Sequence, residues 1–219
     1  MATSHVNESV WEIAYNTLKG KIVSGEIPAG GRIIETAWAS YLHISRTPLR
    51  EALRCLEQDG LVDCNPRHGV IVKAFSVSDV EQIYAIRNAL ELLTLPFICQ
   101  NADAWKLEGL RGILRQMDNV LDDVEQLNPL ARQFHASYTA MCGQPRIIQA
   151  IQAQDIYINR FTALAVQHEQ HRLESHREHY RMVALAENGN LEELRTLTAA
   201  HLEASKMNCL AALRLLKDE

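Results

Sequence analysis

The 219-residue chain has a formal net charge of −5 and is 47% hydrophobic and 22% charged, which is ordinary for a soluble globular protein. The negative charge argues against a protein that coats nucleic acid non-specifically. The chain does not open with a cationic segment followed by an apolar core, and its longest uncharged apolar stretch, 92–102, is too short to span a bilayer. We therefore expect no signal peptide, no membrane contact and a cytoplasmic location. Scattered cysteines without a C-x-x-C pair favour reduced thiols there.

The N-terminal third predicts three helices followed by two short strands. Apolar residues at helical spacing indicate a helix over 10–24, which ends at Gly25-Glu26-Ile27-Pro28. A short helix over 36–42 and a longer one that starts near Ser45 come next, and the strands 61–64 and 70–72 flank the turn 65–69. Two helices joined by a short turn and followed by a β-hairpin are typical of a winged helix-turn-helix.

From residue 76 onward the pattern predicts helices only. We expect a capping box at Ser78–Glu81 to start a helix that runs to about 100, and further helices over about 103–123, 129–142, 145–167, 174–188 and 191–216. Six helices in this length suit an antiparallel bundle with its own core. The predicted fold is thus mainly α, with a winged helix-turn-helix domain at 1–75 and an all-α antiparallel helical bundle at 76–219.

The start of the third predicted helix carries candidate DNA-reading residues. Ser45, Arg46, Thr47 and Arg50 cluster at its N-terminal end, and its leucines lie on the other side. A recognition helix reads bases with its N-terminal turns, arginine can bind guanine bidentately, and small hydroxyls suit phosphates. Spacing alone fits a capped, surface-exposed amphipathic helix equally well. In the wing turn, His68 and Gly69 are candidates for contacts with the minor groove or the backbone.

These segments resemble the GntR family of regulators. The resemblance lies in the runs Ile22–Gly30 (IVSGEIPAG) and Ser45–Val62 (SRTPLREALRCLEQDGLV), in order and with matching gaps. It implies that Arg46, Thr47, Arg50 and the wing contact double-stranded operator DNA. Two departures stand out. His43 replaces a common glycine before the recognition helix, and Thr36 stands where some members place a DNA-contacting arginine.

The second part of the chain resembles the FCD branch of the FadR-type ligand-binding domains. The resemblance lies in Ile86–Glu91 (IRNALE), Phe134-His135, Glu178–Arg181 (EHYR) and His201. It implies a sensor in which an Asp and three His hold a divalent metal and a carboxylate-bearing effector completes the shell. We expect zinc or nickel as the metal, a small organic acid as the effector and a homodimer as the assembly. The family's Asp would stand one turn before the first His, where this chain has Ala131.

Periodicity places three histidines on inward faces of their helices. His135, His179 and His201 each share a face with apolar residues, and convergent imidazoles suit such a metal. The alternative is three separate core histidines, each bonded to a neighbour. Because Ala131 cannot bind metal, the site either keeps three histidines with an open place, recruits another side chain, or has lost the metal. We hypothesise a three-histidine site.

Other polar residues are candidates for the effector pocket. Arg87 falls on the core side of its helix and needs an anionic partner, which is either a carboxylate effector or Glu91. Asp155, Asn159 and Thr162 form a polar stripe that either lines the pocket or faces solvent. We expect the remaining histidines of this region to face solvent, namely His168, His171 and His176.

The sequence therefore favours a DNA-binding transcription regulator, a repressor by preference, and not an enzyme. Phosphate-binding glycine loops and nucleophile motifs are missing from it. A metal-dependent hydrolase built on the three histidines is one alternative, but it would not need Arg46 or Arg50. A helical ligand-binding adaptor is the other, and it leaves the winged helix unexplained.

Overall fold

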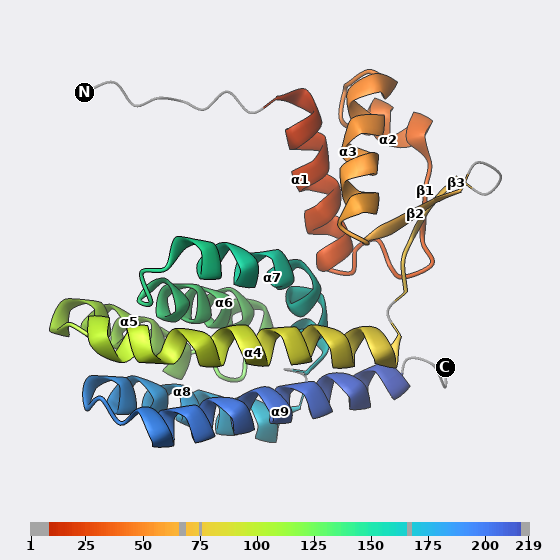
Figure 1. Ribbon diagram of the computed structural model, residues 1–219. Coiled ribbons are helices and arrows are strands. Elements are labelled where there is room, and N and C mark those ends of the chain that lie inside the picture. Colours follow the sequence, from red (N-terminus) through yellow and green to blue (C-terminus); the bar gives the residue numbers. More distant parts are fainter. Residues whose placement is uncertain (1–8, 66–68, 75, 166–167, 216–219) are drawn as a thin grey trace, which may run out of the picture. The chain divides into compact units, whose positions relative to one another are not determined.

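The computed structural model describes residues 9–65, 69–74, 76–165 and 168–215, with side chains for all of them except 156 and 159–165. The chain divides into two compact units, 1–75 and 76–219 (Figure 1). None of the described helices combines the length and the apolar character that crossing a bilayer requires.

The first unit is a helical cluster with a small sheet. Its elements are α1 (Val10–Val23), β1 (Arg32–Ile33), α2 (Glu35–Tyr41), α3 (Arg46–Gln58), β2 (Val62–Asn65) and β3 (Gly69–Val72). Helix α3 buries Leu49, Leu53 and Leu56 against α1, whose Leu18 and Ile22 are fully buried. This confirms the predicted winged helix-turn-helix.

The sheet has one strand more than the sequence predicts. Its order is β1-β3-β2, and both pairings are antiparallel. Strand β1 is not among the predicted strands, but Arg32 pairs with Ile71 and Ile33 pairs with Val70. A strand of two residues is too short to show the alternation of side chains by which strands are recognised in a sequence. Its pairing with β3 is therefore visible only in the folded structure.

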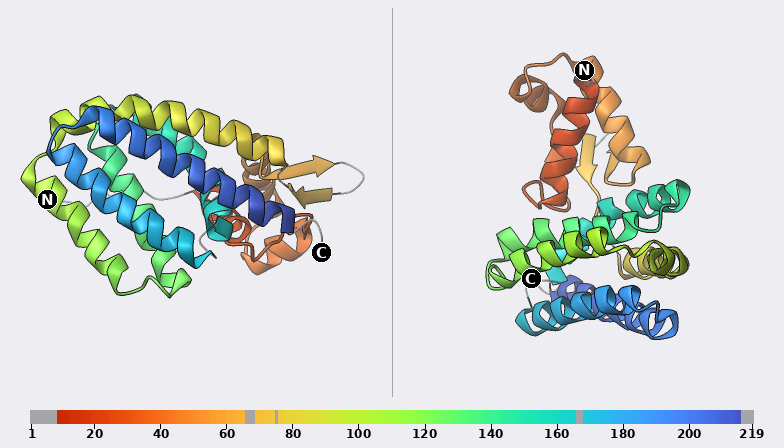
Figure 2. Two further views of the ribbon diagram at one scale, coloured as in Figure 1. Left: turned by 90° about the horizontal axis from the view of Figure 1, so that it is seen from below. Right: turned by 90° about the vertical axis from the view of Figure 1, so that its left-hand side faces the viewer.

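The second unit is the predicted all-α bundle, with six helices in the described residues. They are α4 (Val77–Asn101), α5 (Ala104–Asp118), α6 (Val124–Ala140), α7 (Pro145–Ala165), α8 (Glu169–Glu187) and α9 (Leu191–Leu215). The long helices α4 and α9 lie side by side, and Figure 2 shows the same pairing from two further directions. Helix α7 packs on both of them, while α8 packs on α9 and α5.

Three helix starts differ from the predictions. The capping box of α4 is formed by Ser76 and Asp79, two residues earlier than expected, with Ser76 N donating to Asp79 Oδ2 at 2.7 Å. Helix α6 begins at Val124 and runs through Pro129, because Leu127 and Phe134 are buried on either side of the proline and outweigh one lost amide donor. Helix α8 begins five residues early, and Arg172 in its first turn donates to the carbonyl of Leu121 at 3.1 Å.

Candidate functional site

The N-terminal turn of α3 exposes a compact polar group. Ser45 is the N-cap of the helix, and its side chain makes no capping hydrogen bond. Ser45, Arg46, Thr47 and Arg50 are all exposed, whereas Leu49 beside them is fully buried. The helix thus presents its first turn to solvent and its leucines to the core, which is the geometry that a groove-reading helix requires.

Both arginines of this turn are held by a single carboxylate. Arg50 Nε donates to Glu35 Oε2 at 2.9 Å, and Arg46 Nη2 donates to the same oxygen at 3.1 Å. Partial burial acts to raise the pKa of Glu35, but the hydrogen bonds from Arg50 and Arg46 outweigh it and lower that pKa. The sequence-based site did not include Glu35, because it lies 15 residues from Arg50 and no local spacing links them.

The turns around α3 depend on left-handed backbone. His43, in the turn between α2 and α3, has φ of 55°, a conformation that glycine adopts without strain. This is the position where the family commonly has glycine. In the wing, Gly69 has φ of 79° and is exposed at the start of β3. His68 lies outside the described residues.

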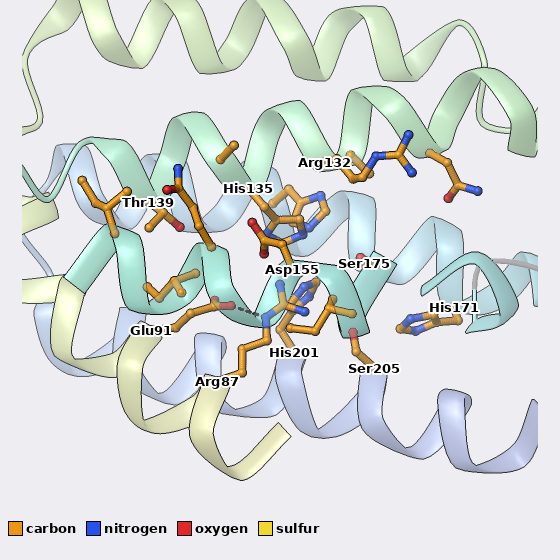
Figure 3. A pocket seen from close by; sticks show the side chains of 18 residues that line it. Arg87, Glu91, Arg132, His135, Thr139, Asp155, His171, Ser175, His201 and Ser205 are labelled. Atoms are coloured by element: carbon orange, nitrogen blue, oxygen red, sulfur yellow. Dashed lines mark hydrogen bonds and ion pairs between the residues drawn. The ribbon is translucent and has the colours of Figure 1, made fainter. Parts of the chain in front are cut away.

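The helical unit encloses a cavity of about 210 Å³. Helices α4, α6, α7, α8 and α9 all contribute to its wall (Figure 3). The candidate residues that line it are Arg87, Glu91, Ala131, His135, Asp155, His171, His179 and His201. Candidate side chains from five helices, spread over more than 100 residues of sequence, thus share one enclosed space.

Three histidines converge at this cavity from α6, α8 and α9. One nitrogen of each of His135, His179 and His201 lies within 4.8 Å of those of the other two. His179 and His201 are buried and His135 is half-buried. The rings of His135 and His179 meet edge-on with centroids 4.8 Å apart. Three imidazole nitrogens gathered in this way are a suitable donor set for a first-row divalent ion.

The hydrogen bonding within the histidine cluster leaves the ring of His179 without a partner in the described part of the chain. Nδ1 of His201 is 2.7 Å from Glu178 Oε2, so Nε2 is the ring nitrogen that remains to bind a metal. Neither ring nitrogen of the buried His179 has a hydrogen-bond partner among the described residues. A neutral imidazole carries one donor and one acceptor, so two unpartnered nitrogens in a buried ring are costly unless something binds there. These residues fit a metal ion.

The charge state of the cluster also suits a metal. Burial lowers the pKa of His179 well below its usual value, and the neighbouring His135 and His201 lower it further. Burial and the positive charge of Arg87 have the same effect on the pKa of His135. Both rings are therefore neutral near pH 7, and neutral imidazole is the form that coordinates metals.

The acidic ligand of the resembling family has no counterpart on α6. Ala131 lines the cavity at the expected position, one turn before His135, and offers only a methyl group. Asp155 lines the same cavity from α7 (Figure 3). It is not a member of the group of mutually close ligand atoms, which consists of the three histidines. The side chains of Asn159 and Thr162 lie outside the described residues.

Arg87 is buried beside the histidines and forms an ion pair with Glu91, one turn further along α4 (Figure 3). The intramolecular partner that the sequence offered as an alternative is therefore present. Both residues also line the cavity. A polar ligand in this cavity would meet a guanidinium and a carboxylate that already neutralise each other.

The expectation that three further histidines face solvent is wrong for His176. His176 is buried, and its Nε2 is 2.6 Å from Asp118 Oδ1, while Tyr180 donates to the other oxygen of Asp118. The cause is tertiary, because the end of α5 packs against α8 and brings Asp118 to this ring. His171 is half-buried and lines the cavity, and only His168 is exposed.

Comparison with known families matches both units. Residues 12–72 match the family described as bacterial regulatory proteins, gntR family, and residues 82–204 match the FCD domain. The second match alone spans more than half of the chain. Both matches agree with the resemblances drawn from the sequence, whereas assignment to a FadR subfamily is a finer distinction than they make.

Comparison with individual proteins also finds transcriptional regulators among the similar sequences. The chain is 36% identical over 125 residues to the uncharacterized HTH-type transcriptional regulator YdhC of Bacillus subtilis, which is 55% of each protein. It is 40% identical over 78 residues to an HTH-type transcriptional regulator from the TAR-I ttuE-ttuC' intergenic region of Agrobacterium vitis, which is 36% of this chain and 46% of that protein. The chain thus spans about half the length of these two curated relatives.

A solved structure extends the likeness to the whole fold. The E. coli protein McbR/YncC superimposes with a TM-score of 0.78 over 96% of this chain and 99% of that one, at 21% identity. This likeness supports the order of a winged helix-turn-helix and a helical domain. The family that matches residues 12–72 is one of bacterial regulatory proteins, which favours a regulator over the hydrolase alternative.

Proposed function

Because this chain belongs to the GntR family of bacterial regulatory proteins and carries an FCD domain, we propose that it is an operator-binding repressor controlled by a small organic acid. Residues 1–75 form the DNA-binding domain and residues 76–219 form the sensing and dimerisation domain. The protein acts in the cytoplasm, where the chromosome lies.

The exposed first turn of α3 carries the DNA-binding part of the proposal. Arg46 and Arg50 are one helical turn apart on one face, and both side chains are more than half exposed. Inserted into a major groove, they reach base edges, while the hydroxyls of Ser45 and Thr47 reach phosphates. His68 and Gly69 of the wing contact the adjacent backbone or minor groove, and the lack of a side chain at Gly69 allows a close approach.

Selection from a random pool of DNA duplexes tests this part directly. The full chain is expected to enrich one palindromic sequence, since a homodimer presents two recognition helices to two half-sites. Arg50→Ala should weaken binding to that duplex by about 1–3 kcal/mol through loss of a base contact. Arg195→Ala removes an equal charge from an exposed position on α9 and serves as the control. Unchanged affinity in Arg50→Ala would exclude this helix as the reader.

The second part of the proposal concerns the cavity. His135, His179 and His201 hold a divalent metal, zinc or nickel before others, and the place of the family's Asp stays open beside Ala131. The bound metal supplies a Lewis-acidic site that attracts a carboxylate. The two unpartnered nitrogens of His179 support this assignment. Arg87, Asp155 and Asn159 are the proposed contacts for the rest of the effector.

Metal and effector binding are coupled to folding and therefore measurable without knowing the operator. A ligand that binds only the folded state raises the unfolding temperature by mass action. Thermal unfolding with a set of small organic acids, each with and without zinc or nickel, should reveal an acid that stabilises only the metal-loaded protein. An acid that stabilises chelator-treated and metal-loaded protein equally would contradict a metal-held effector.

We propose that a homodimer transmits the effector signal to DNA. Helix α4 exposes two large apolar side chains two turns apart, Ile86 and Leu93, which supports a protein contact on that helix. If the acid releases the operator, linkage requires operator DNA to lower the affinity for the acid by the same factor. Titrating the acid against the protein with and without its selected duplex measures both sides of this relationship.

A further inference from the structure

The shared carboxylate of Glu35 connects the two arginines that the proposed function places in the DNA groove. We propose that Glu35 is a positioning residue that sets sequence specificity, by aligning Arg46 and Arg50 for bases and by withholding them from phosphates. The inference rests on the proposed function and deepens it. It assigns to the first residue of α2 a role in DNA recognition that the sequence does not reveal.

The geometry of the three side chains carries the first half of this inference. Arg50 uses its Nε toward Glu35 and Arg46 uses one terminal nitrogen, so each guanidinium keeps other N–H groups for DNA. Bidentate recognition of guanine needs two N–H groups in one plane. An exposed arginine otherwise samples many rotamers, and a carboxylate that holds its plane before binding lowers the entropy lost in the complex.

The charges carry the second half. Residues 1–75 contain eight Lys or Arg and eight Asp or Glu, so the DNA-binding unit has no net formal charge. Sequence-independent binding depends on cations that neutralise phosphates. While Glu35 pairs with both arginines, the group carries one positive charge instead of two, and phosphates must compete with a carboxylate already in contact. These arginines therefore contribute less binding free energy on random DNA than on a site that offers base acceptors.

Two substitutions at Glu35 separate charge from geometry. Glu35→Gln keeps an acceptor oxygen at the same reach but removes the charge. Glu35→Asp keeps the charge but shortens the side chain, so one carboxylate oxygen no longer reaches both arginines. The control is Glu51→Gln. Glu51 is exposed on α3, so this substitution removes the same charge from the same unit and leaves Glu35, Arg46 and Arg50 unchanged.

The experiment uses the full chain, the duplex that the wild type enriches from a random pool, and a scrambled duplex of equal length. Glu35→Gln should bind the scrambled duplex about threefold more tightly, with a steeper salt dependence. Its preference for the enriched duplex should fall by about tenfold or more. Glu35→Asp should lose preference mainly through weaker binding to the enriched duplex. In Glu51→Gln the preference should stay within about twofold of wild type.

Three results would overturn the inference. One is an unchanged preference in Glu35→Gln. Another is an equal loss of preference in Glu51→Gln, which would make the effect one of net charge alone. The third is a lower unfolding temperature with equal weakening on both duplexes, which would make Glu35 a structural residue only. If the wild type enriches no duplex, the proposed function itself fails, and that outcome is distinct from these three.

Discussion

The rings of His179 and His201 lie with their centroids 4.9 Å apart, although they come from different helices, α8 and α9. Because α8 and α9 pack side by side, histidines 22 residues apart in sequence share one cavity with His135 of α6. Glu178, one residue before His179, reaches back to the ring of His201. The arrangement joins the proposed ligands to one another and to a carboxylate that orients one of them.

We predict that the protein retains a divalent metal when it is purified without chelators, and that His179→Ala does not. Removing His179 leaves two imidazoles, which are too few to hold the ion tightly in competition with water. Elemental analysis of the purified protein measures the metal per chain. His168→Ala, at an exposed position, is the matched control and should keep the metal. The assignment would be contradicted if the wild-type protein contains no metal as purified and also fails to bind zinc or nickel when either is added.

We predict that Glu178→Gln weakens metal affinity by roughly 10–100-fold without abolishing binding. The carboxylate of Glu178 accepts from Nδ1 of His201, fixes the tautomer of the ring and makes its other nitrogen a better donor. Competition with a metal-binding dye measures the affinity. Glu174→Gln removes the same charge from an exposed position on the same helix. Equal weakening by both variants would mean that Glu178 acts only through its charge at a distance.

We predict that the metal-free protein loses stability as the pH falls below about 6.5. His135 and His179 have lowered pKa values in the folded state, mainly through burial, whereas the unfolded chain binds protons at the ordinary pKa near 6.5. The unfolded state therefore binds more protons below that pH, and each histidine costs up to about 1.4 kcal/mol of unfolding free energy per pH unit. Above about pH 7.5 this contribution to stability is fully present.

Urea unfolding of metal-free protein between pH 8 and pH 5 measures this dependence. In His179→Asn the dependence should be visibly shallower, because one of the histidines with a lowered pKa no longer titrates. His168→Asn should retain the wild-type slope. A wild-type unfolding free energy that is flat between pH 7.5 and pH 5.5 would be incompatible with two buried neutral imidazoles.

We predict that position 43 tolerates glycine but not valine. Its φ of 55° strains any residue with a Cβ, and β-branched residues most. His43→Val should destabilise the protein by about 1–3 kcal/mol. His43→Gly should change stability by less than about 0.5 kcal/mol, because relief of strain is offset by the larger entropy of glycine in the unfolded chain. Thermal unfolding measures both, and an equal loss in the two variants would exclude backbone strain as the cause.

The recognition helix was predictable because its evidence is local. Ser45 stands at its N-cap position, its leucines repeat at helical spacing, and Gly60 follows its end, so the sequence places the exposed face of Arg46 and Arg50. The carboxylate that holds both arginines was not predictable. Glu35 lies 11 residues before Arg46, on another helix, and only the folded structure brings the two side chains together.

The helical unit shows the same division. Inward faces for His135, His179 and His201 follow from apolar neighbours on each helix, and the structure brings the three rings to one cavity. The same reasoning failed for His176, which was expected in solvent and is buried against Asp118. The polar residues around His176 on α8 do not indicate that its partner is Asp118, which lies 58 residues away on α5.

By itself the sequence determined the family, the order of the two domains, and the helix faces that carry the arginines and the histidines. Those features depend on caps, turns and side-chain periods that act within one or two helical turns. Only the tertiary structure decided which carboxylate the arginines of α3 and His201 meet, namely Glu35 for the arginines and Glu178 for His201. The reason is physical: helix packing decides which side chains from different helices meet, and local periodicity records only which side of a helix is buried.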